Sequence, residues 1–237
     1  MENINIVSGG RESLGIGIPF GTLSTKPFWS KDPEDLPMPT PDSYTIHIGD
    51  TMIHALNTLT WNIGNGKLIQ SNLCSKCRWP DIIHSGLIAG KDVTIDGLKF
   101  LARIPVLEED TALCGKFQIT RASYWAYSTE QMEQQPFTLM PGEDPASIVI
   151  AGPANEYLRL VLTPIRPNLE DLVGKRVRLL LNSCIITAHL QEIDTYDLTC
   201  TRVNICNGQI SNTYAQWHAD LETLYIARDA VVNAGEV

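Results

Sequence analysis

KRVRLLLNSCIITAHLQEIDTYDLTCTRVNI, residues 175–205, is the stretch that decides the fold. It holds three apolar runs of strand length, at 175–181, 185–193 and 198–205, and the polar residues 194–197 make a tight bend between the last two. A short helix or turn at 169–174 precedes them, and two more strand-like runs follow at 223–226 and 230–232. Five short strands in roughly 65 residues are typical of a small barrel, whose closure removes exposed sheet edges. The sequence therefore predicts a small five-stranded β-barrel over 168–237.

The region before the predicted barrel, residues 44–166, also has the sequence pattern of a β-rich domain. Its expected hairpins turn at Gly64-Asn65-Gly66 and at Asp96-Gly97, which are strong turn signals. Residues 124–146 are polar and contain proline, which predicts a loop with at most one helical turn. The remaining expectations are strands at 44–50, 115–120, 147–150 and 157–162 and a short helix at 79–86.

Residues 1–43 differ from the rest, because glycines crowd the first half and prolines the second. Proline removes a backbone donor and restricts the residue before it, so regular structure across 27–41 is not expected. We predict an extended arm that lies on its own domain or on a neighbouring subunit. Its expected anchors are the apolar side chains of Ile16, Ile18, Phe20, Phe28 and Trp29. The predicted fold class is thus mainly β (α+β), with an arm at 1–43, a β-rich domain at 44–166 and a small barrel at 168–237.

Composition and charge exclude several functional classes. The 237 residues include 27 Asp and Glu against 18 Lys and Arg, a net charge of −9, and 43% are hydrophobic. Such a chain can bury a core, but it lacks the basic face that a general binder of nucleic acid or anionic membranes needs. No apolar run approaches the roughly 18 residues of a membrane span. The first residues, MENINIVSGG, do not have the pattern of a secretory signal. We therefore expect no membrane span and a location inside a cell or a particle.

Residues 168–235 resemble the Sm/Hfq-like family. The resemblance rests on Leu172–Val177 at the start of the first strand, on Ile186–Leu198, which is similar to the first Sm motif, and on Leu224–Val232, which is similar to the second. It implies a short N-terminal helix, five bent strands, and subunits that pair edge strands into rings. The chain departs from the family at two places: Ala188 stands where the first motif usually has glycine, and Ala227-Arg228 stands where an RNA-binding ring commonly has Arg-Gly.

The resemblance also implies a candidate RNA site at Tyr196 and Arg228, which could stack on and pair with nucleotides. Binding of RNA depends on the neutralisation of phosphates. Residues 168–237 carry five Lys and Arg against nine Asp and Glu, so 5 − 9 gives a net charge of −4. Asp194, Asp197 and Asp229 stand beside the two candidates and would repel phosphate. We therefore predict a barrel used for assembly and keep an RNA-binding Sm/Hfq-like ring with an accessory N-terminal domain as the alternative.

The middle region bears a weaker resemblance to prophage-encoded proteins of the C-type-lectin/formylglycine-generating-like fold. The similarity lies in Trp79, in Arg121–Trp125 and in Leu158–Leu162, although Tyr157-Leu158 replaces the usual Gly-Phe. It implies a lectin-like fold over 44–166 and a binding role without an activity. Tyr124, Trp125 and Tyr127 are the aromatic candidates for a glycan platform, with core packing as the alternative role.

Cysteine and histidine spacing gives little support to metal binding or catalysis. Cys74 and Cys77 form a CxxC pair, a weak metal candidate because no second half of a zinc site accompanies it. A metal- or thiol-dependent enzyme built on these two residues and Cys114 is a third hypothesis. The sequence has no HExxH and no GxSxG motif. The acidic runs Glu108–Asp110 and Glu143-Asp144 are expected to be solvated loops.

These observations converge on a non-enzymatic binding and assembly protein without metal or cofactor. The resemblances imply a phage or prophage component, structural or tail-associated, that is cytoplasmic or virion-associated. The expected partner is protein, through self-association into a homo-oligomer or docking to a particle. A glycan is a further candidate ligand, and nucleic acid is not an expected one.

Overall fold

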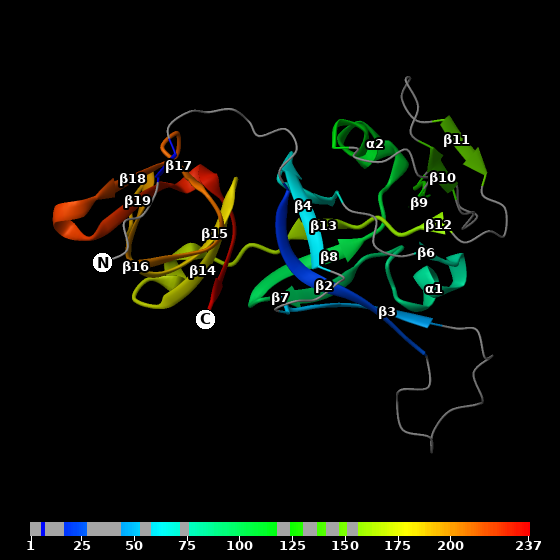
Figure 1. Ribbon diagram of the computed structural model, residues 1–237, viewed down its shortest axis with the longest axis horizontal. Helices are drawn as coiled ribbons and strands as arrows, with labels where there is room; N and C mark the ends of the chain where they lie inside the picture. Colours follow the sequence, from blue (N-terminus) through cyan, green and yellow to red (C-terminus); the bar gives the residue numbers. More distant parts are fainter. Residues whose placement is uncertain are drawn as a thin grey trace, which may run out of the picture. The chain divides into compact units, whose positions relative to one another are not determined.

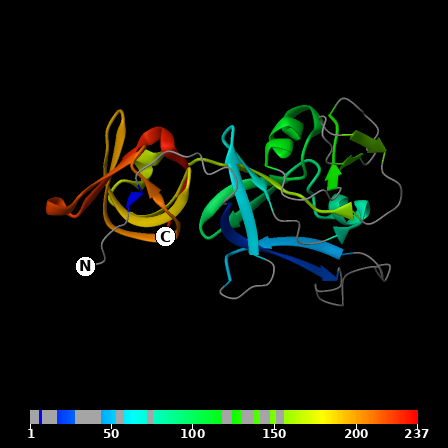
Figure 2. The same ribbon diagram turned by 45° about the horizontal axis from the view of Figure 1, so that its top comes forward.

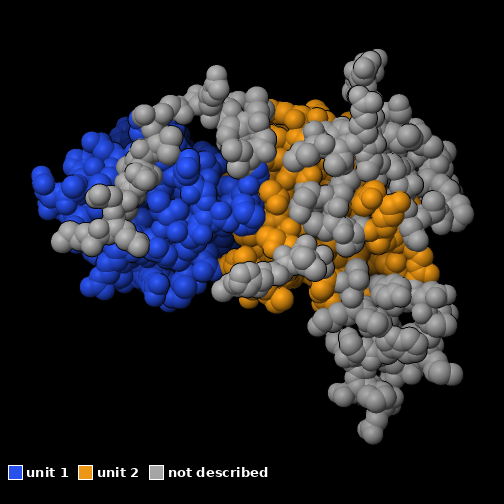
Figure 3. Space-filling view, viewed as in Figure 1, with its two compact units in different colours: residues 1–19, 97–100, 164–237 blue, residues 20–96, 101–163 orange. Residues whose placement is uncertain are grey.

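The computed structural model describes residues 6–7, 17–27, 44–52, 58–71, 76–117, 124–129, 137–140, 147–150 and 156–237. It is mainly β, with 57% of residues in strands and two α-helices in the described ranges. The chain divides into two compact units (Figure 3). Unit 1 comprises residues 1–19, 97–100 and 164–237, and unit 2 comprises 20–96 and 101–163. Among the described residues, neither helix is long and apolar enough to cross a bilayer.

Unit 2 contains most of a seven-stranded antiparallel sheet that is nearly closed (Figure 1). Its two end strands, β3 and β7, lie against each other. The chain after β3 reinforces this closure, because the Thr51 amide donates to Asp96 Oδ1 at 2.9 Å and the Asp96 amide donates to Asp50 Oδ1 at 2.5 Å. The strands, in sheet order, are β3 (Tyr44–Gly49), β2 (Ile18–Pro27), β4 (Thr58–Gly64), β5 (Lys67–Gln70), β13 (Val161–Pro164), β8 (Leu98–Arg103) and β7 (Lys91–Ile95).

Residues 18–27, which the sequence places in the extended arm, form an interior strand of this sheet. β2 pairs with β3 from Thr22 to Pro27 and has β4 on its other side. Ile18, Phe20 and Leu23 are buried, and the Trp61 indole donates to the Phe20 carbonyl at 2.9 Å. The glycines that suggested an arm did not prevent a strand, since the apolar side chains between them supply a buried face. The expected anchors Ile16, Phe28 and Trp29 lie outside the described residues.

Both hairpins predicted within residues 44–166 are confirmed. β4 and β5 are joined through Asn65 and Gly66, and β7 and β8 through Asp96 and Gly97. All four turn residues have positive φ, between 49° and 84°. Two consecutive residues of positive φ match the right-handed twist of the flanking strands, which is why Asn-Gly and Asp-Gly predict such turns from sequence.

A second sheet of unit 2 and its two helices depart more from the predictions. The helix α1 (Trp79–His84) is as expected, but α2 (Leu107–Lys116) includes Gly115, where a strand was predicted, and also the acidic run, where a loop was predicted. The expected loop at 124–146 contains two strands instead. The five-stranded sheet has the order β11 (Ser147–Ile150), β10 (Phe137–Met140), β9 (Tyr124–Ala126), β12 (Glu156–Tyr157) and β6 (Lys76–Cys77). Main-chain pairing between distant segments, rather than local propensity, forms these short strands.

Unit 1 contains the five predicted C-terminal strands in one strongly curved sheet (Figures 1 and 2). A 3-10 helix, η2 (Leu169–Leu172), precedes them, as predicted. The sheet has six strands because the segment between β16 and β19 adds one. In order they are β18 (Ala215–His218), β19 (Thr223–Ala227), β16 (Asp197–Gly208), β15 (Cys184–Ile193), β14 (Arg176–Leu181) and β20 (Val231–Glu236).

The core of unit 1 is lined by the inward-facing side chains of these strands. Val177, Leu179 and Leu181 alternate along β14, and Leu198 and Cys200 alternate along β16. The period of two follows from strand geometry and is what the quoted sequence stretch displays. Unit 1 also holds the two-residue strand β1 (Ile6–Val7), which pairs in parallel with β17 (Ile210–Ser211). Residues 1–19 and 97–100 also group with unit 1, so β8 begins in unit 1 and ends in unit 2.

Candidate functional site

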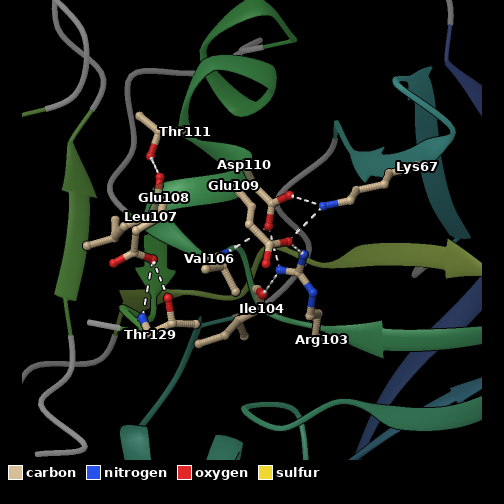
Figure 4. Close-up of polar contacts among 10 residues, drawn as sticks. All are labelled: Lys67, Arg103, Ile104, Val106, Leu107, Glu108, Glu109, Asp110, Thr111 and Thr129. Carbon is tan, nitrogen blue, oxygen red and sulfur yellow. Dashed lines mark hydrogen bonds and ion pairs between the residues drawn. The ribbon is translucent and has the colours of Figure 1, made fainter. Parts of the chain in front are cut away.

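The densest group of buried charges lies in unit 2, at the start of α2 (Figure 4). Glu109 and Asp110 stand in the first turn of this helix, where the helix dipole favours negative charge. Arg103 comes from the end of β8, and Lys67 comes from the start of β5. The side chains of Asp110 and Arg103 are 0% and 8% exposed, so this is an interior cluster with one open side at Glu109.

Each charge of this ionic cluster has a direct partner. Asp110 accepts hydrogen bonds from Arg103 Nη1, from Lys67 Nζ at 2.9 Å and from the Val106 amide at 2.8 Å. Glu109 Oε2 accepts from Arg103 Nη2 at 2.8 Å and from Lys67 Nζ at 2.9 Å. Two cations face two carboxylates, so the cluster is neutral as a whole.

The electrostatics hold Asp110 in its charged form. Burial by itself raises the pKa of Asp110, but the hydrogen bonds from Arg103, Val106 and Lys67 outweigh it and hold the pKa below the usual value. For Lys67, burial lowers the pKa, and the hydrogen bonds to Asp110 and Glu109 reverse the effect and raise it. A carboxylate fixed as an anion by three donors is a poor general acid or base, because its pKa lies far from neutrality. The arrangement suits a structural clamp that ties α2 to β5 and β8.

A second buried cation, Arg159, is held by main-chain carbonyls. Its guanidinium donates to the carbonyls of Gln70 at 3.0 Å, Cys114 at 3.2 Å and Phe117 at 3.0 Å. The last two carbonyls belong to the end of α2, which leaves carbonyls unsatisfied and favours positive charge. Arg159 is 2% exposed and lies 4.8 Å from the centre of the Tyr124 ring. The predicted strand at 157–162 is interrupted here, because β12 ends at Tyr157 and β13 begins at Val161.

The three aromatic candidates for a glycan platform lie on and just after β9. Tyr124 and Trp125 are buried, at 5% and 1% exposure, and Tyr127 is half-buried. The Trp125 indole donates to the Cys77 carbonyl at 2.9 Å, and its ring centre lies 5.4 Å from that of Trp79. A sugar platform requires an open ring face. These contacts place Tyr124 and Trp125 in packing roles.

Tyr196 and Arg228 lie next to each other in unit 1, and the Arg228 side chain is already engaged. The Arg228 amide donates to the Tyr196 carbonyl at 2.7 Å. Arg228 Nη2 pairs with Glu170 Oε1 at 2.7 Å, and Nη1 donates to the Asp194 carbonyl at 3.4 Å. The Asp194 carboxylate accepts the amides of Tyr196 and Asp197, and these backbone hydrogen bonds lower its pKa. Tyr196 is 79% exposed.

The buried thiols, which include Cys77 and Cys114 of the third hypothesis, are poorly suited to metal binding or nucleophilic chemistry. Burial raises the pKa of Cys77 to about 12, and burial likewise raises the pKa of Cys114. A thiol must lose its proton to act as a ligand or nucleophile. Cys74 lies outside the described residues. Within the described ranges, no group of three or more His, Cys, Asp or Glu is placed to hold a metal ion.

Sequence reasoning missed the ionic cluster at the start of α2 and the buried cation Arg159. The run Leu107-Glu108-Glu109-Asp110 followed by helix-forming residues is a helix start with acidic residues in the first turn, and this signal would have identified α2. No comparable signal marks Arg159 or Lys67, since their partners are distant in sequence.

The described residues thus contain three notable features: the ionic cluster at the start of α2, the end of α2 capped by Arg159, and the turn with the exposed Tyr196. Comparisons of the chain with protein-family models, with curated proteins and with solved structures give no match.

Proposed function

We propose that the chain is a non-enzymatic binding and assembly protein, a structural or tail-associated component of a phage or prophage particle. In this proposal the small barrel of unit 1 makes the contacts with protein. The resemblance of residues 168–235 to Sm/Hfq-like barrels supports the assembly role. The weaker resemblance of 44–166 to lectin-like prophage proteins supports the particle. The mainly β structure is compatible with both.

The observation that carries the proposal is that the charged groups at the turn of Tyr196 are bonded to other groups of the same chain. Arg228, the one basic residue of the second Sm-like motif, forms an ion pair with Glu170 and donates to the Asp194 carbonyl. A phosphate approaching Tyr196 would meet the ionised Asp194 carboxylate and a guanidinium that is already neutralised. A protein partner has no such requirement, and an exposed tyrosine is a frequent anchor at protein interfaces.

The hydrogen bonding and the pKa values of the remaining polar groups support a non-catalytic role. Among the described residues, no buried side-chain nitrogen or oxygen lacks a hydrogen-bond partner. The most buried carboxylate, Asp110, and the buried thiols have pKa values displaced away from neutrality. Catalytic acids and bases have pKa values near the working pH instead.

RNA binding, the alternative function, is tested by fluorescence anisotropy with short U-rich and A-rich RNAs at about 50 mM salt, where phosphate contacts are strongest. We expect no saturable binding by the purified chain, because its acidic turn repels phosphate. The variant Glu170→Gln releases Arg228 from its ion pair and is the matched probe of the same turn. Saturable, salt-dependent binding that disappears in Arg228→Ala would contradict the proposal and establish the RNA-binding alternative.

A further inference from the structure

The sheet of unit 1 has two edges, and one of them is covered by the unit itself. β20 forms the first edge, beside β14. Its Asn233 side chain donates to the Lys99 carbonyl at 2.8 Å, and Arg166 Nε donates to the Val232 carbonyl at 3.0 Å. A Cβ added at Gly235 would lie 2.3 Å from the Gly97 carbonyl oxygen, so the backbones approach closely there. This edge is closed to a further strand.

The second edge, β18, turns outward backbone groups that have no partner among the described residues. β18 pairs with β19 in the register Ala215 with Ile226 and His218 with Thr223, and the Tyr214 carbonyl accepts the Ala227 amide at 2.7 Å. In an antiparallel pair, alternate residues turn their N–H and C=O groups to the same neighbour. Gln216 therefore faces β19, while Ala215 and Trp217 turn their backbone groups outward. No described residue bonds these outward groups.

β18 also lacks the usual protection of an edge strand. Proteins commonly protect such edges with charged side chains, proline or a bulge. The sequence Ala-Gln-Trp-His has no Asp, Glu, Lys, Arg or proline, and its pairing with β19 has no register shift. In both views the β18–β19 hairpin extends away from the rest of unit 1 (Figures 1 and 2). Leu221, at the end of this hairpin, is 62% exposed.

We propose that β18 pairs in antiparallel fashion with β18 of a second copy of the chain. The inference deepens the proposed assembly function and rests on it. In the register that uses every outward group, Ala215 of each copy exchanges two hydrogen bonds with Trp217 of the other. Gln216 then lies directly opposite Gln216 of the second copy, in a non-hydrogen-bonded pair whose side chains are close. The contact is a twofold one, the commonest symmetry of homodimers.

The charges around β18 favour a second copy in this orientation. Asp220 and Glu222 follow the strand directly. Antiparallel pairing places these acids beside Ser211–Tyr214 of the other copy, which are uncharged. Parallel pairing would instead set the acids of both copies side by side. Four residues of strand span roughly 13 Å, which exceeds the Debye length of about 8 Å at physiological salt, so the two acidic ends are screened from each other.

The test is light scattering coupled to size exclusion, on the full chain at about 50 µM, where mass action favours a dimer. We expect the wild type at twice 26.3 kDa. Gln216→Lys and Gln216→Glu should each elute at half the wild-type mass, because like charges then face each other across the twofold axis. Mixing the two variants should restore the dimer. Gln209→Lys adds the same charge at an exposed position outside β18 and should remain dimeric.

Three results would overturn the inference: a monomeric wild type, charge variants that remain dimeric, or a mixture that stays monomeric. A monomeric wild type that still co-sediments with a large protein particle would remove β18 pairing and leave the proposed function intact. A dimer that binds RNA would keep β18 pairing and contradict the proposed function.

Discussion

Replacing Asp110 with asparagine should lower the free energy of unfolding by about 3 to 5 kcal/mol, the usual cost of removing one partner from a buried ion pair. The substitution keeps the shape of the side chain and removes its charge. Arg103, 8% exposed, and Lys67 then share the single carboxylate of Glu109. Urea unfolding followed by tryptophan fluorescence measures the change, since Trp61 and Trp125 are buried in the same unit.

The matched control is Glu109→Gln in the same helical turn. Glu109 pairs with the same two cations, but its side chain is 53% exposed. Solvent screening limits exposed ion pairs to about 0 to 1 kcal/mol, so this variant should stay within that range. Equal losses in the two variants would contradict the assignment of Asp110 as the central acceptor of the cluster.

The stability difference between wild type and Asp110→Asn should also depend on pH. Burial raises the pKa of Asp110, but its three hydrogen bonds lower it further, so the folded value lies below the unfolded value of about 3.9. The stability that Asp110 contributes is therefore fully present above about pH 4 and is lost as the pH falls through the lower, folded value. The stability difference between wild type and Asp110→Asn should shrink across that acidic window and stay constant between about pH 6 and 8.

Replacing Arg159 with methionine should cost about 3 kcal/mol or more, because two buried carbonyls and one partly buried carbonyl lose their donor at once. Each unsatisfied buried group costs roughly 1 to 3 kcal/mol, and these costs are only partly additive. Methionine fills a similar volume, so the loss of hydrogen bonds dominates over cavity formation. Arg159→Lys should recover a fraction of the stability, since a single ammonium lacks the planar fork that reaches three acceptors. Urea unfolding again provides the measurement.

Arg166→Met is the control for the second prediction. Arg166 also donates to one main-chain carbonyl, that of Val232 at 3.0 Å, but it is exposed, so water replaces its hydrogen bond. Its loss should change the free energy of unfolding by less than about 1 kcal/mol. A comparable effect of the two substitutions would show that the Arg159 carbonyl contacts carry no special weight.

Much of the fold could be predicted from local signals. The hairpins of unit 2 follow from Asn65-Gly66 and Asp96-Gly97, whose backbone preferences are set by the residues themselves. The strands of unit 1 follow from the alternation in residues 175–205. The strand β2 was missed because glycine and proline nearby outweighed the apolar residues Ile18, Phe20 and Leu23, whose spacing breaks the period of two at Gly21. Its pairing with β3 is a tertiary effect that overrides local propensity.

The buried polar groups could not be predicted in the same way. Lys67, Arg103 and Asp110 are brought together by the packing of a helix on two strands, and sequence spacing does not record that packing. Arg159 meets Gln70, 89 positions away in sequence. The motif residues Tyr196 and Arg228 were brought together because they lie at the ends of adjacent strands, yet their charge partner Glu170 comes from η2.

The measurement that tests the assembly role most directly is gradient sedimentation of the chain in an extract of the cells that make it, before and after ribonuclease treatment. We predict that the chain co-sediments with a protein particle far larger than its own 26.3 kDa and that ribonuclease leaves its position unchanged. Sedimentation as a free small protein, or a fast peak that ribonuclease abolishes, would contradict the proposal that this barrel serves protein assembly.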